Sequence, residues 1–139
     1  VLPSAATDGT LLLHEPPALV LGSEAVYCDV VDPSSTFPRV ERVTPDEALL
    51  AAVRAALPDA HVLPIGTSGL LGGGTGCDVE AMEGFGVLRA AELAGVPAVE
   101  LRAVSNVVGE ADRTKWRFDD AFALLANAVS RLTVELAHA

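Results

Sequence analysis

The sequence predicts a three-layer α/β fold, in which a mostly parallel or mixed sheet is flanked by helices. Half of the 139 residues are hydrophobic, and the aromatic ones are four Phe, one Tyr and one Trp. Ala, Val and Leu therefore supply most of the apolar content, which favours helices and buried strands. Strand and helix patterns also alternate along the chain, and the length suits one domain covering 1–139.

The first part of the chain predicts strand and loop. Residues 1–17 are interrupted by Pro and Gly, so we expect an irregular lead-in. Residues 18–31 are aliphatic and β-branched, which predicts one or two strands. Residues 32–38 (Asp-Pro-Ser-Ser-Thr-Phe-Pro) have the composition of a loop.

A helix start follows at Thr44. Thr44 is a capping residue, Pro45 suits the first helical position, and Glu47 completes a capping box. This pattern predicts a helix that ends near Leu57. Residues 61–66 (His-Val-Leu-Pro-Ile-Gly) then read as a short buried strand.

The second half continues the alternation. A glycine-rich loop leads to Asp78, which is predicted to cap a helix over 79–94 that ends at Gly95. Residues 97–105 predict a further strand, and 106–117 a polar loop. A last helix is expected from Asp119 or Asp120 to Leu136.

Composition limits the classes of function. A net charge of −10 argues against a nucleic-acid surface, because phosphate binding needs clustered Lys and Arg. No apolar run approaches the roughly 20 residues that cross a bilayer, and no secretory signal is recognisable. We therefore expect a cytoplasmic protein without a membrane partner. Cys28 and Cys77 match no metal-ligand spacing and are expected to be buried thiols without a disulfide.

The glycine-rich segment 69–76 resembles a phosphate cradle only superficially. It lacks the Lys-Ser/Thr pair and the GxGxxG spacing, which weakens a dinucleotide-binding interpretation. In parallel sheets ligands bind beyond the carboxyl ends of strands, so the loops after residues 66 and 105 are the places to search. Thr67, Ser68 and Gly69 are candidate ligand contacts there, with a plain flexible connection as the alternative.

A second group of candidates surrounds Met82. Glu80 and Glu83 are predicted to share a face at the start of a helix. They are either a solvated acidic first turn or a ligand site, and the glycines at 84 and 86 favour close backbone approach. Ser105 and Asn106 end a strand, and Asn106 is either a turn residue or a ligand contact.

Together these segments resemble a family. Residues 80–86 (Glu-Ala-Met-Glu-Gly-Phe-Gly), 95–97 (Gly-Val-Pro) and 100–109 (Glu-Leu-Arg-Ala-Val-Ser-Asn-Val-Val-Gly) resemble the futalosine hydrolases. Asp112-Arg113 and Trp116 look like the end of the same signature. That family belongs with the methylthioadenosine/adenosylhomocysteine nucleosidases and nucleoside phosphorylases. The resemblance runs from about residue 66 to the end and is fainter over 19–29.

The resemblance implies hydrolysis of the N-ribosidic bond of futalosine, releasing hypoxanthine for menaquinone synthesis. It assigns catalytic roles to Glu83, which grips the ribose hydroxyls, and to Asn106, which recognises the base. Met82 packs against the sugar, and Thr67, Ser68, Gly69 and Ser105 complete the substrate-binding set. Related aminopurine nucleosidases carry Asp where this chain has Asn106, and an amide suits a 6-oxopurine better. No metal or organic cofactor is implied, and a homodimer is expected.

The resemblance also implies a longer fold. The chain begins at Val1, and no counterpart of the family's water-activating acid is found in residues 1–17. We therefore expect N-terminal strands to be missing from this sequence. The chain is then a fragment of an enzyme, a chain completed by a partner, or a reduced relative that binds a nucleoside without cleaving it.

Overall fold

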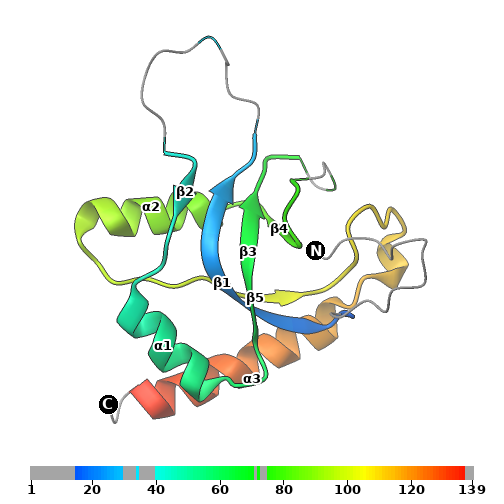
Figure 1. The fold of residues 1–139 in the computed structure, drawn as a ribbon. Helices are drawn as coiled ribbons and strands as arrows, with labels where there is room; N and C mark the ends of the chain where they lie inside the picture. The colour runs from blue at the N-terminus through cyan, green and yellow to red at the C-terminus, as the bar shows by residue number, and fades with distance from the viewer. Residues whose placement is uncertain (1–14, 30–33, 35–39, 71, 73–74, 137–139) are drawn as a thin grey trace.

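A computed structural model of the chain describes residues 15–29, 34, 40–70, 72 and 75–136. The predicted lead-in up to residue 14 and most of the predicted loop at 32–38 lie outside these residues. Within them, a mixed sheet of five strands is flanked by helices, as the sequence predicts (Figure 1).

The sheet is built around β1 (Ala18–Tyr27), which is one continuous strand in the described region. It pairs in parallel with β3 (His61–Thr67), and β3 pairs in parallel with β4 (Val79–Ala81). On its other edge β1 pairs with two antiparallel strands, β2 (Arg42–Val43) and β5 (Leu101–Val104). The two-residue β2 has too little pattern to be predicted, and β5 is shorter than the predicted strand at 97–105.

A bulge lets β1 pack against helices on both faces of the sheet. Before the register shift between Gly22 and Glu24, Leu19 and Leu21 pack against α1 and α3. After it, Ala25 packs with Leu88 of α2. An extra residue in a strand reverses which face the following side chains point to. The result is a layered arrangement, with α2 (Gly84–Ala94) opposite α1 (Glu47–Ala56) and α3 (Phe118–Leu136).

The start of α1 differs from the prediction. Asp46, not Thr44, is the N-cap, and its Oδ1 accepts a hydrogen bond from the Leu49 N–H at 2.8 Å. A cap at Thr44 would place Asp46 inside the first turn. The Asp46 backbone is extended instead, and its N–H donates to the Ala98 carbonyl at 3.0 Å. A contact with a distant segment therefore sets where the helix begins.

The segment 79–81 differs more from the prediction. It forms a strand, whereas the sequence predicts that a helix begins at residue 79. Val79 pairs with Ile65 and is 1% exposed, so this segment contributes to the core on the α2 face of the sheet. Helix α2 starts at Gly84, and Glu83, not Asp78, is its N-cap residue. Its end is as predicted, with Gly95 in the left-handed conformation at φ 66°.

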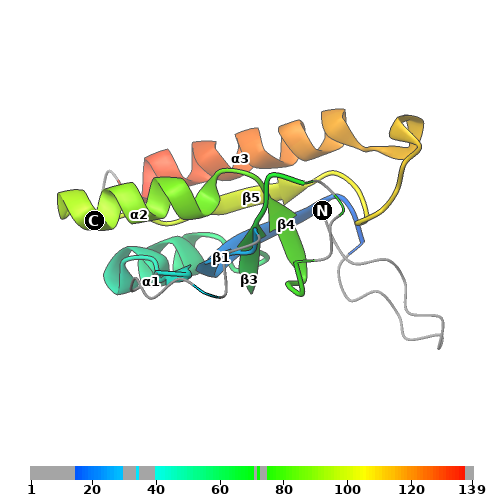
Figure 2. The same cartoon turned by 90° about the horizontal axis from the view of Figure 1, so that it is seen from above.

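The last helix, α3, is confirmed within two residues of its predicted start. It spans 19 residues and runs beside β5 (Figure 2). Its buried Ala128 packs on Leu21 and on Val53 of α1. None of the helices in the described part of the chain is long and apolar enough to cross a membrane.

The core predicts the effect of truncating Leu21, whose side chain is fully buried between β1, α1 and α3. We expect Leu21→Ala to lower the free energy of unfolding by about 2–5 kcal/mol, because it leaves a cavity in a packed core. Urea unfolding followed by circular dichroism measures the change. Leu93→Ala is the control, since Leu93 is 71% exposed, and equal losses for both variants would contradict this description of the core.

Candidate functional site

An ion-pair chain joins the start of α2 to β5. Glu83 makes no side-chain capping bond, and its Oε2 lies 3.4 Å from Nη2 of Arg102. Arg102 also donates from Nε to Oε1 of Glu100 at 2.7 Å. One guanidinium therefore holds two carboxylates, of which Glu83 is 66% exposed and Glu100 is 6% exposed at the side chain. Met82, next to Glu83, is also exposed.

The buried Glu100 carboxylate packs directly against the first residue of α2. A Cβ built at Gly84 would overlap the Glu100 carboxylate, so any larger residue at this position would displace that carboxylate. Oε2 of Glu100 is buried and has no hydrogen-bond partner among the described residues. The nearby Arg102 charge and the positive end of α2 both offset the cost of burying this anion.

The segment that leaves β3 is fixed by side chains on both of its flanks. Thr67 is buried, and its Oγ1 accepts a hydrogen bond from the Phe85 N–H at 2.9 Å. Ser68 donates from Oγ to Oδ1 of Asp29 at 2.8 Å, and the Gly69 N–H reaches the same carboxylate at 3.0 Å. Asp29 therefore positions two of the three predicted contacts, and Thr67 joins this segment to the start of α2.

Glu80 organises the glycine-rich loop and does not face a ligand beside Glu83. Its carboxylate accepts hydrogen bonds from the N–H groups of Gly72 at 3.2 Å and Thr75 at 2.9 Å. Because Glu80 lies on β4 and Glu83 occupies the N-cap position of α2, the prediction that they share a helix face is wrong.

Ser105 and Asn106 lie at the edge of a separate cavity of about 500 Å³. Asn106 is 5% exposed, and its Oδ1 accepts a hydrogen bond from the Ser105 hydroxyl at 2.8 Å. Its Nδ2 donates to the Val107 carbonyl at 3.1 Å. An amide nitrogen carries two N–H groups, so one further donor of Asn106 remains for a ligand.

The two predicted ligand loops do not share one edge of the sheet. Thr67 pairs with Tyr27 at the end of β1, whereas Val104 pairs with Ala18 at its beginning. The loops after residues 66 and 105 lie at opposite edges because β3 runs parallel to β1 and β5 runs antiparallel to it. The glycine-rich loop reaches from the end of β3 toward the loop after β5. The two loops are close at Gly72, where a Cβ built on the backbone would lie 3.6 Å from the Gly109 nitrogen.

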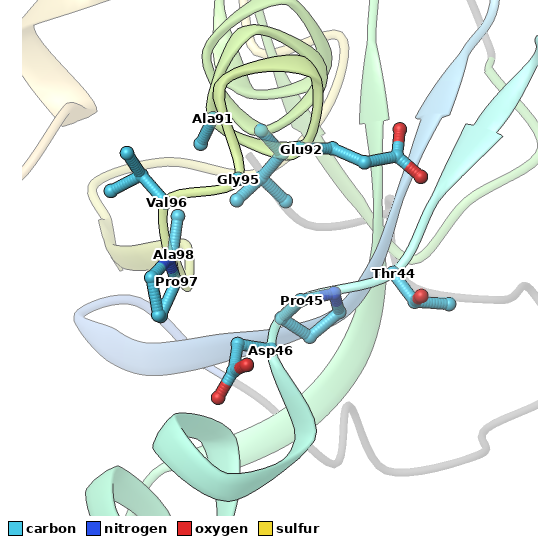
Figure 3. Close-up of a pocket in the computed structure, with 10 residues that line it drawn as sticks. Thr44, Pro45, Asp46, Ala91, Glu92, Gly95, Val96, Pro97 and Ala98 are labelled. Atoms are coloured by element: carbon cyan, nitrogen blue, oxygen red, sulfur yellow. The ribbon is translucent and has the colours of Figure 1, made fainter.

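A further cavity, of about 300 Å³, lies between the start of α1 and the end of α2 (Figure 3). Asp46 and Glu92 are its charged residues, and none of the predicted site residues lines it. The described residues contain no group of three side chains that could hold a metal ion. Cys28 and Cys77 are free and half-buried, and burial raises the pKa of the Cys28 thiol.

Sequence reasoning gave no role to Asp29, Glu100 or Arg102. The alternation of side chains along a strand could have identified Glu100 and Arg102, because residues 100, 102 and 104 point to the same face. Two charged residues on the face that carries the buried Val104 indicate that their charges are paired. No comparable local pattern marks Asp29, whose partners lie about 40 positions further along the chain.

Comparison with known proteins finds relatives that match part of this chain. The chain is 58% identical over 57 residues to futalosine hydrolase of Streptomyces coelicolor, covering 41% of this chain and 24% of that relative. It is 45% identical over 60 residues to futalosine hydrolase of Thermus thermophilus, covering 43% and 27%. The matches thus span about a quarter of the length of these curated relatives. No family model matches the chain.

Solved structures share the fold. Futalosine hydrolase of Helicobacter pylori superposes with a TM-score of 0.75 at 16% identity, covering 100% of this chain and 66% of that one. A methylthioadenosine/adenosylhomocysteine nucleosidase of S. pneumoniae gives 0.77 at 15% identity, covering 97% and 66%. The chain therefore has the nucleosidase fold. Within that class, the predicted resemblance to the futalosine hydrolases is confirmed over part of the chain.

The contact between Gly84 and Glu100 predicts a large effect of one methyl group. We expect Gly84→Ala to lower the free energy of unfolding by about 1–3 kcal/mol, because the new Cβ displaces a buried, ion-paired carboxylate. Thermal and urea unfolding measure the loss.

Gly86→Ala is the matched control on the same helix, because a Cβ built there meets nothing within 4 Å. It is expected to raise stability by about 0.5–1 kcal/mol through helix propensity. Similar effects of the two substitutions would mean that Glu100 does not occupy the space beside Gly84.

Proposed function

We propose that this chain carries the ribose- and base-binding part of a hydrolase that cleaves the N-ribosidic bond of a purine nucleoside. The proposed substrate is futalosine, the released base is hypoxanthine, and the pathway served is menaquinone synthesis. The observation that carries the proposal is the ion pair between Glu83 and Arg102. Arg102 lies on β5, and Asn106, which lines the cavity of about 500 Å³, follows Arg102 by four residues. The similarity to futalosine hydrolases supports the choice of substrate.

Glu83 suits the sugar end of the site. Cleavage of the bond between C1′ and the base nitrogen builds positive charge on the ribose, and a fixed carboxylate stabilises that charge. Arg102 restrains Glu83, whose exposed oxygens remain able to accept hydrogen bonds from the ribose hydroxyls. Met82 lies beside it as the proposed apolar contact of the sugar.

Asn106 suits the base end. As the bond breaks, its electron pair goes to the departing purine, which must be stabilised by a hydrogen bond or a proton. The remaining N–H of Asn106 can donate to the base nitrogen, and the Ser105 hydroxyl holds the amide in that orientation. Water supplies the oxygen that bonds to C1′ and a proton for the base. By resemblance, this water is activated by an acidic residue of the kind that the family's first strands carry.

The proposal extends to assembly and location. The resemblance supports a homodimer in the cytoplasm, with a purine nucleoside as ligand and neither metal nor organic cofactor. Solved neighbours with the same fold are described with nucleoside-like inhibitors, which supports a small-molecule ligand.

The direct test is incubation of futalosine with the purified protein in a form that includes the water-activating residue, followed by chromatography for hypoxanthine. We expect release by the unmodified protein and a loss of about 10²-fold or more in its Glu83→Gln variant, because the neutral amide no longer stabilises the ribose charge. Glu92→Gln is the control, since Glu92 is an exposed carboxylate of α2 with an arginine partner. Unchanged release in Glu83→Gln would remove Glu83 from the site, and nucleoside binding without any release would favour a non-catalytic relative.

Asn106→Asp tests base selection. An ionised carboxylate repels the 6-oxo group and accepts from a 6-amino group, so we expect the ratio of inosine to adenosine cleavage to fall about tenfold or more. Initial rates with the two nucleosides give this ratio. Asn127→Asp makes the same chemical change on the exposed surface of α3. A ratio that is the same in all three proteins would contradict the role of Asn106.

A further inference from the structure

The cavity beside Asn106 contains a side chain to which the proposed function gives no role. One wall is formed by the loop after β5 and by η1 (Arg113–Lys115), and the glycine-rich loop contributes Gly72. Its aromatic rings belong to Trp116 and Phe118, whose centroids lie 5.4 Å apart. The lining residues are Gly72, Ser105, Asn106, Gly109, Glu110, Ala111, Arg113, Trp116 and Phe118.

Arg113 lines this cavity, and its charge is not paired with a carboxylate of the described residues. Its guanidinium carbon lies 5.5 Å from the centroid of the Trp116 ring, which is a cation–π geometry. In the described part of the chain it has no ion-pair partner. The neighbouring Asp112 uses Oδ1 for the Thr114 N–H at 3.0 Å and the Thr114 hydroxyl at 2.7 Å. Five N–H donors of Arg113 are therefore available to a ligand.

The carboxylate of this cavity is already occupied. Oε1 of Glu110 accepts from the Asp112 N–H at 2.9 Å, and Oε2 accepts from Nζ of Lys115 at 3.1 Å. These two bonds lower the pKa of Glu110, so it stays ionised and bound to its own loop. The Glu110 carbonyl in turn accepts from Nε1 of Trp116 at 2.9 Å, which fixes the indole.

The groups left to meet a ligand are consequently hydrogen-bond donors. They are the Arg113 guanidinium and the second N–H of Asn106, whose Oδ1 is taken by Ser105. A 6-oxopurine presents two acceptors, O6 and N7, on one edge, whereas a 6-aminopurine presents a donor beside N7. A cavity with free donors and aromatic rings matches the 6-oxopurine edge and opposes the amino group.

We propose that Arg113 is a specificity-determining residue that donates to O6 of a 6-oxopurine while Asn106 donates to N7. This inference rests on the proposed function, because it assigns the base to the same cavity. Arg113 adds the charged donor that a neutral amide does not supply. The cation–π contact with Trp116 holds the guanidinium at the rim of the cavity before the base arrives.

Trp116 provides the measurement, because it is the single tryptophan of the chain and lines the cavity. Titration of the 139-residue chain with hypoxanthine and with adenine, followed by tryptophan fluorescence, yields two dissociation constants. We expect the unmodified chain to prefer hypoxanthine by about tenfold or more, as for other arginine contacts to an O6–N7 edge. Arg113→Ala should abolish this preference while leaving adenine affinity within about threefold, and Arg113→Lys should keep part of it.

Arg89→Ala is the matched control, since it removes the same charge from the surface of α2, where Arg89 pairs with Glu92. It should keep the full preference. A preference for hypoxanthine that survives in Arg113→Ala would overturn the role of Arg113 and leave the proposed function standing. An unmodified chain that binds both bases equally, or neither, would overturn base recognition in this cavity and the proposed function with it.

Discussion

The arrangement of the site depends on the position of Arg102 between Glu100 and Glu83. A buried carboxylate is costly unless it is paired, and the guanidinium provides that pairing while projecting from the middle of β5. The same group then reaches the exposed Glu83, which begins α2. Because Glu100 also fills the space beside Gly84, the start of α2 is restrained by both charge and packing. The proposed sugar-binding carboxylate is therefore positioned by the sheet and not by its own loop.

The bulge in β1 makes this arrangement compatible with a closed core. Before the bulge, Leu19 and Leu21 pack against α1 and α3. After the bulge, Ala25 packs against α2. At the bulge, Gly22 donates its N–H to the Glu100 carbonyl at 2.8 Å. A Cβ built at Gly22 would lie only 3.4 Å from the Glu100 Cβ and 3.2 Å from Ile65 Cδ1. The strand thus bends where the backbone that carries Glu100 approaches most closely.

What the sequence predicted correctly was determined by local signals. Gly95 ends α2 because glycine adopts the left-handed conformation, and the short apolar run at 61–66 forms most of β3, whose last three residues are buried. The incorrect predictions concern segments whose secondary structure depends on a partner distant in the sequence. Val79 joins a strand because Ile65 offers it a partner 14 positions away along the chain, and Asp46 caps α1 while its N–H bonds Ala98. For the site, Glu83 and Asn106 came from motifs, but the antiparallel pairing of β5 with β1 was not visible in local patterns.

The acidic character of the chain makes the donor-rich cavity informative. A net charge of −10 would lead one to expect free carboxylates in any hollow of the surface. Around this cavity, however, the carboxylates of Glu110 and Asp112 accept hydrogen bonds from groups of their own loop. These hydrogen bonds lower the pKa of both carboxyl groups. This local pairing leaves the donors of Arg113 and Asn106 free to meet a ligand in an otherwise acidic protein. The proposed site is accordingly divided, with the exposed Glu83 carboxylate assigned to the sugar and the donors of Asn106 and Arg113 assigned to the base. This division matches the charge that develops on each half of a nucleoside as its ribosidic bond breaks.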